Sequence, residues 1–61
     1  MKVKDIINAV YLDEETPNCV NVWDGGELIF CYKGNLTVPK GILNRTVKAI
    51  FVGYFCIGLE V

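Results

Sequence analysis

The stretch "NVWDGGELIF", residues 21–30, decides the fold, because it places an acid and two glycines between two apolar runs. Residues 19–23 and 27–33 are predicted to form two strands around this glycine turn. A three-residue loop from Asp24 to Gly26 would pair Trp23 with Glu27. A two-residue loop would mix apolar and polar residues on each face, so we expect the three-residue form. That register gives one apolar face, made of Val20, Val22, Leu28, Phe30 and Tyr32.

The flanking segments predict two helices and a second hairpin. A helix over residues 3–12 is indicated by helical spacing of the apolar residues Val3, Ile6, Ile7 and Val10. The acidic stretch 13–18 contains Pro17, which cannot continue a helix, and reads as a linker. Pro39 favours a short helix over 39–44, with the proline at its first position.

Residues 45–52 and 55–61 read as two further strands around Gly53 and Tyr54. Alternation in the last strand points one set of side chains toward the core: Phe55, Ile57, Leu59 and Val61. Across the turn, Ile50 and Val52 should share that face. The sequence therefore predicts a single α+β domain over residues 1–61, ordered α-β-β-α-β-β. We expect a four-stranded antiparallel sheet with one main helix and a short second helix on one face.

The cysteine count and the N-terminal sequence indicate a reducing environment. Three cysteines are an odd number, and "MKVKDIINAV" does not have the form of a signal peptide. We therefore expect free thiols, no disulfide and a cytoplasmic location. The longest uncharged run, residues 49–59, falls short of the roughly 18 apolar residues that a membrane helix requires, so no membrane association is expected.

Charge and residue types disfavour catalysis and nucleic-acid binding. The net charge is −1, and six basic residues are scattered among seven acids, whereas nucleic-acid binders normally carry a basic stripe. The chain has no histidine, so it lacks the commonest general base and metal ligand. No catalytic, metal-binding or cofactor-binding residues are assigned. The acids Asp13, Glu14 and Glu15 are interpreted as a solvated linker, and Asp24 as a residue that shapes the turn.

The predicted register places Cys19 directly opposite Cys31. Two such thiolates could supply half of a zinc site, or they could oxidise to a disulfide. The simpler interpretation is that each cysteine serves as a small apolar side chain. A zinc site completed by a second subunit is the one route by which this chain could support an enzyme.

The sheet face turned away from the helices is predicted to be unusually apolar. A solvent-facing sheet should alternate to polar residues, but this face would carry Trp23 and Phe51, which are typical interface anchors. The alternative is that the second helix or a terminus of the chain covers them. We expect face-to-face self-association through a set of interface residues: Trp23, Ile29, Cys31, Phe51 and Cys56. A chain that is 52% hydrophobic at this length also favours oligomerisation.

Four segments of the chain carry a family resemblance: residues 3–7, 24–27, 39–43 and 45–50. With these the chain resembles short uncharacterised proteins of Firmicute phages and related mobile elements. Those proteins open with a Met-x-Val-Lys-Asp helix and continue with an aspartate-glycine hairpin, a Pro-x-x-Leu-Leu-like turn of helix and an Arg-x-Val-x-x-Ile strand. The resemblance covers most of the chain and implies an origin in phage or mobile DNA. It brings no activity or catalytic residue, and the apolar "IFVGYFCIG" departs from the polar surface of the pattern.

Together these observations predict a non-catalytic protein-binding module that self-associates. Its partner would be a host or phage protein, and interference with a host defence or regulatory complex is the expected role. The alternative is a small accessory protein associated with nucleic acid, which would require Tyr11, Tyr32, Trp23 and the lysines to cluster on one face.

Overall fold

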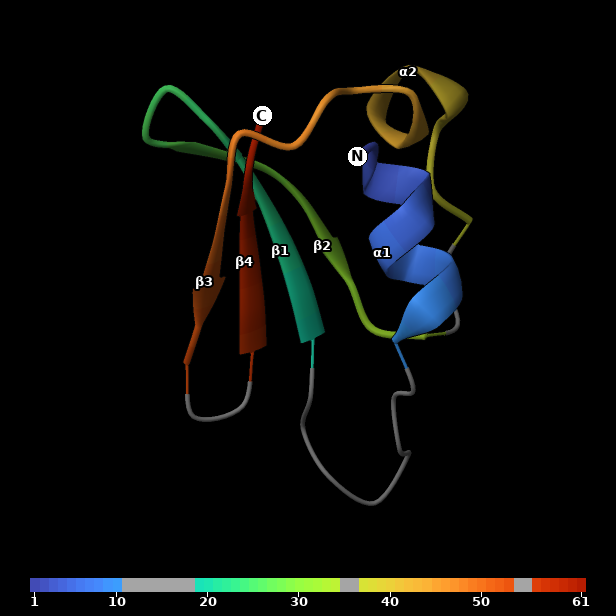
Figure 1. Cartoon of the computed structure of the whole chain (residues 1–61), viewed down its shortest axis with the longest axis horizontal. Helices are drawn as coiled ribbons and strands as arrows, with labels where there is room; N and C mark the ends of the chain where they lie inside the picture. The colour runs from blue at the N-terminus through green and yellow to red at the C-terminus, as the bar shows by residue number, and fades with distance from the viewer. Residues whose placement is uncertain (11–18, 35–36, 54–55) are drawn as a thin grey trace.

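The computed structural model describes residues 1–10, 19–34, 37–53 and 56–61. In chain order its elements are α1 (Val3–Ala9), β1 (Cys19–Asp24), β2 (Glu27–Tyr32), α2 (Lys40–Leu43), β3 (Ala49–Val52) and β4 (Cys56–Glu60) (Figure 1). The predicted α+β class and the α-β-β-α-β-β order are confirmed. The predicted acidic linker, Tyr54 and Phe55 lie outside the described residues. The helix expected over residues 3–12 is shorter than predicted, because α1 ends at Ala9 and the backbone of Val10 is already extended.

The four strands form one mixed sheet in the order β2-β1-β4-β3. The β1–β2 and β3–β4 pairs are antiparallel hairpins, whereas β1 and β4 run parallel side by side (Figure 1). The prediction of an antiparallel sheet is therefore wrong at its central pair. The parallel register places Val20 beside Ile57 and Val22 beside Leu59. This register places the apolar residues of both hairpins on one face of the sheet, where they can be buried together.

The first hairpin turns through two residues, and the expected three-residue loop is wrong. Asp24 pairs with Glu27, while Gly25 and Gly26 have φ values of 59° and 87°, as a type I′ turn requires. A β-bulge follows, because Trp23 pairs with Leu28 but Val22 pairs with Phe30. Compared with the predicted register, the two-residue turn shifts the strand pairing by one residue and the bulge shifts it by one more. Because side chains alternate between faces, a total shift of two residues leaves the predicted residues facing the core beyond the bulge.

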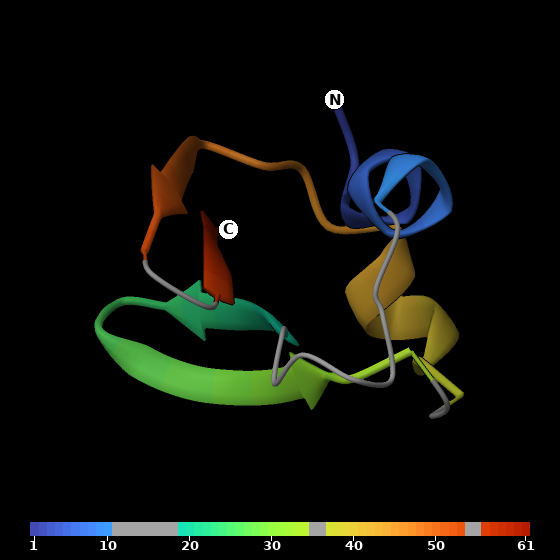
Figure 2. The same cartoon turned by 90° about the horizontal axis from the view of Figure 1, so that it is seen from below.

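The core lies between the sheet and the two helices. Its fully buried side chains come from distant parts of the chain: Val3, Val20, Val22 and Leu59. The apolar stripe of α1 is confirmed, since Ile6, Ile7 and Val10 pack against this cluster. Figure 2 shows both helices on the same side of the sheet.

Local contacts define the helix ends and hold the N-terminal residues. The Asp5 carboxylate accepts a hydrogen bond from the Lys2 backbone N–H at 2.8 Å, which caps α1. The short second helix is confirmed, although Pro39 is its N-cap and Lys40 its first residue. The segment after α2 pairs with the N-terminus, because the Val3 N–H donates to the Arg45 carbonyl and the Val47 N–H donates to that of Met1. Neither helix of the described chain is long enough to cross a bilayer.

The helices leave the β3 edge of the sheet uncovered, even on the face that carries the core. Ile29, Phe30 and Tyr32 of β2 pack against the core cluster, whereas the residues of β3 do not. Ile50 and Val52 pair with Leu59 and Ile57, so they belong to the core-facing side, as predicted. Both are nevertheless exposed, since no helix reaches them.

Replacing Leu59 by alanine should test the position of the core. Leu59 is fully buried on β4, so Leu59→Ala is expected to lower the free energy of unfolding by about 3 kcal/mol through the cavity it leaves. The measurement is urea denaturation followed by circular dichroism. The matched control Leu28→Ala, at a leucine that is 46% exposed on β2, should stay within about 0.5 kcal/mol of wild type. Equal losses in the two variants would contradict this core.

Candidate interaction surface

The outer face of the sheet, turned away from the helices, carries two aromatic side chains from different hairpins. Trp23 lies near the end of β1, and Phe51 lies on β3. Gly58 on β4 lies between them. It pairs with Phe51 on one side and with Asn21 on the other, and Trp23 is the next residue after Asn21 on the same face of β1. A methyl group built on Gly58 would lie 3.4 Å from the Phe51 side chain and 3.7 Å from Trp23 Nε1. The two aromatic residues therefore flank the bare backbone of Gly58.

This arrangement forms an open hollow of about 450 Å³ on the outer face. Its lining residues come from both hairpins: Trp23, Gly26, Phe51, Gly58 and Glu60. The backbone of Gly58, which has no side chain, forms the floor of the hollow. The aromatic rings form its walls, and Glu60 contributes a carboxylate. Because the walls belong to separate hairpins, the hollow exists only when β1 and β4 are paired.

The structure brings together two of the five predicted interface residues. Trp23 and Phe51 both line the hollow. Ile29 does not lie on the outer face as expected, because the bulge turns it to pack against the core. The same shift moves Leu28 out of the predicted core set, and it is exposed opposite Trp23.

Cys31 and Cys56 lie away from the hollow. Cys31 pairs with Asn21 and is partly buried, so the expected Cys19–Cys31 opposition is wrong by two residues of register. The predicted interface residues do not include Gly58 and Glu60. Their alternation with Ile57 and Leu59 indicated the outer face, but only the tertiary structure places them beside Trp23.

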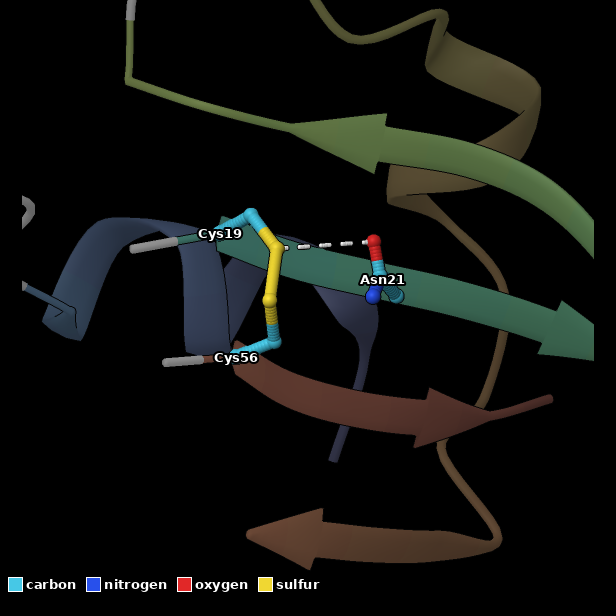
Figure 3. The surroundings of a disulfide bond; sticks show 3 residues. All are labelled: Cys19, Asn21 and Cys56. Atoms are coloured by element: carbon cyan, nitrogen blue, oxygen red, sulfur yellow. Dashed lines mark hydrogen bonds between the residues drawn. A yellow bond between two sulfur atoms is a disulfide. The ribbon is translucent and has the colours of Figure 1, made fainter. Parts of the chain in front are cut away.

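A disulfide joins Cys19 and Cys56, which corrects the prediction of three free thiols. The two residues are the first of β1 and β4 and are register partners, with Cα atoms 4.6 Å apart (Figure 3). This separation lies within the range that a disulfide requires. The bond closes the chain across a sequence separation of 37 residues, which stabilises the fold by about 4 kcal/mol in the chain-entropy account. Cys31 remains a free cysteine.

Asp24 has a different partner from the one expected. Its carboxylate accepts a hydrogen bond from Arg45 Nη2 at 2.9 Å, which ties the end of β1 to the segment after α2. Both side chains are about half exposed, so the pair stabilises the fold by less than about 1 kcal/mol. Asp24 acts here as a link between elements.

Metal ligands do not gather in the described part of the chain. Over residues 1–10, 19–34, 37–53 and 56–61, no group of three or more acidic or cysteine side chains could hold a metal ion. No protein-family model matches the chain, and neither a curated protein nor a solved structure is found to resemble it. The surface must therefore be interpreted from its own geometry.

Reduction of the disulfide should destabilise the fold. The expected loss is about 4 kcal/mol, comparable to the whole stability of a core this small, so the reduced chain should be largely unfolded in modest urea. The measurement is urea denaturation with and without dithiothreitol. Cys56→Ser should behave like the reduced protein even without reductant, because it cannot form the bond.

Cys31→Ser is the matched control and should keep its sensitivity to dithiothreitol. Thiol titration of the denatured, unreduced wild type should find one reactive group per chain, since Cys31 is the free cysteine. Three reactive groups would contradict the disulfide.

Proposed function

We propose that the chain is a non-catalytic protein-binding module, of the kind carried by phages and mobile elements, and that it self-associates. The observation that carries the proposal is the hollow between Trp23 and Phe51 on the outer face. Tryptophan and other large anchors at the centre of an interface provide much of its binding energy. The module would act by occupying the surface of a partner protein.

The chemistry of the hollow favours a side chain of another protein as its occupant. Its walls are apolar and its mouth is open, whereas small-molecule sites enclose most of their ligand. Glu60 adds one carboxylate beside the apolar walls. The surface therefore fits an aromatic or aliphatic side chain with a basic group next to it in the partner.

The proposed role is interference with a host defence or regulatory complex in the cytoplasm. The role follows from the resemblance to phage and mobile-element proteins together with an exposed binding surface. A cytoplasmic location requires the disulfide to persist in a reducing compartment, where disulfides are rare. The Cys19–Cys56 bond must resist reduction there for the hollow to keep its shape.

The nucleic-acid alternative gains no support from the arrangement of aromatic residues. It requires the aromatic residues and lysines to share one face, and Tyr11 lies outside the described residues. Trp23 lines the outer hollow, whereas Tyr32 packs against the core on the opposite side of the sheet. Arg45, one of the six basic residues, is paired with Asp24. We therefore put forward protein binding alone.

Affinity capture from host or infected cells tests the proposal through a pair of matched variants. Trp23→Asp removes one wall of the hollow and adds a charge beside Glu60. It should weaken capture of the specific partner at least about tenfold, as expected for loss of an interface anchor. The measurement is quantitative mass spectrometry of the captured proteins, followed by a binding titration with the purified partner.

Leu28→Asp is the control, since Leu28 is also exposed on the first hairpin and pairs with Trp23 but does not line the hollow. This variant should capture the partner as the wild type does. Both variants must first show wild-type circular dichroism. Equal capture by Trp23→Asp and wild type would rule out the hollow as the binding surface.

A further inference from the structure

β3 is an edge strand whose outward side has no pairing partner among residues 1–10, 19–34, 37–53 and 56–61. It ends the strand order β2-β1-β4-β3 and pairs with β4 alone. Three consecutive large apolar residues on it are exposed: Ile50 by 47%, Phe51 by 54% and Val52 by 84%. Proteins normally protect such an edge with a charge, a proline, a bulge or a covering element. β3 contains no charged residue or proline, and its pairing with β4 is regular.

The other edge strand of the sheet is protected. β2 begins at the charged Glu27, carries the bulge at Ile29, and is half-buried over residues 29–32. Ile29, Phe30 and Tyr32 of this strand also pack against the core. The contrast identifies β3 as the edge that is open to pairing.

We propose that β3 pairs antiparallel with β3 of a second copy of the chain, so that two sheets join into one. The inference rests on the self-association included in the proposed function and replaces face-to-face contact with edge pairing. A second copy is the occupant that the residues favour, because this strand is complementary to itself. A two-fold axis between two antiparallel edge strands must stand perpendicular to the sheet, and it keeps the same face of both copies on the same side.

The two-fold axis limits the possible registers. A residue can lie opposite only a residue of its own face, and the registers that pair most of this four-residue strand place the axis beside either Ile50 or Phe51. With the axis at Phe51, the two Phe51 side chains meet on the outer face and Ile50 lies opposite Val52 on the inner face. With the axis at Ile50, the apolar Val52 would lie opposite the charged Lys48. The Phe51 register therefore matches apolar residues throughout.

The backbone hydrogen bonds agree with this register. The Gly53 N–H donates to the Cys56 carbonyl, so Gly53 forms a hydrogen-bonded pair with β4. Antiparallel ladders alternate, so Phe51 also directs its backbone groups to β4 while Ile50 and Val52 direct theirs outward. In the proposed dimer Ile50 faces Val52 of the other copy, and each outward N–H meets an outward carbonyl.

The dimer places two binding surfaces on one continuous face. Phe51 lies at the axis and also forms a wall of the hollow, so the two hollows would lie next to each other across the axis. A partner that offers two suitable side chains could then bind both copies at once, which raises its overall affinity.

The test removes one outward N–H while leaving the chain's own sheet intact. Val52→Pro deletes a donor that faces away from β4, and proline is tolerated at such edge positions. Light scattering after size-exclusion chromatography should find a dimeric wild type over a dilution series. Val52→Pro should raise the dimer dissociation constant at least about tenfold, because both copies lose a hydrogen bond. Val52→Ala keeps the N–H and should dissociate less readily than Val52→Pro.

A second variant guards against misfolding of the proline variant. Val52→Lys keeps the backbone donor but sets a charge opposite Ile50 of the other copy, and it should also yield monomers with wild-type circular dichroism. A wild type that stays monomeric over the whole series would overturn the edge pairing and the proposed self-association together. A dimer that resists Val52→Pro and Val52→Lys but dissociates with Trp23→Asp would overturn the edge pairing alone and support face-to-face contact. A dimer insensitive to all three variants would overturn both modes of contact.

Discussion

The parallel pairing of β1 with β4 is the interaction on which the rest of the structure depends. Each hairpin alone is a two-stranded unit with an apolar face, and such a unit is only marginally stable in water. The β1–β4 pair joins them into one sheet and brings Val20 and Val22 against Ile57 and Leu59. The Cys19–Cys56 disulfide fixes the start of this pair, and the N–H of Val61 donates to the carbonyl of Trp23 at its other end.

The same pairing couples the two faces of the sheet. On the inner face it assembles the core that the helices cover, and on the outer face it sets Trp23 beside Gly58 and Phe51. A change in the β1–β4 pair would therefore alter the binding hollow as well as the stability of the chain. Gly58 has an unusual part in this, since the absence of its side chain creates the space between the rings. The hollow between the rings is open to the surface and does not require a cavity in the core.

The size of the helix layer explains why one strand remains open. A seven-residue α1 is about 10 Å long, and a helix is about 10 Å wide with its side chains. Strands repeat about every 4.8 Å, so one short helix covers the width of roughly two strands. The core is accordingly complete over β1 and its neighbours, while Ile50 and Val52 of β3 have the same inward register but no cover. A larger helix or a second chain would be needed to bury them.

Sequence alone determined the number, type and order of the elements, because periodicity and turn residues act over a few neighbouring positions. It also identified the apolar stripe of α1, the inward positions of β1 and β4, and the outward Trp23 and Phe51. Only the tertiary structure decided the parallel β1–β4 pair, the Cys19–Cys56 bond and the bulge that redirects Ile29. These features depend on which distant segments become neighbours. Residues 37 apart in the chain carry no local pattern that reveals their contact, whereas a strand's alternation is written in consecutive residues.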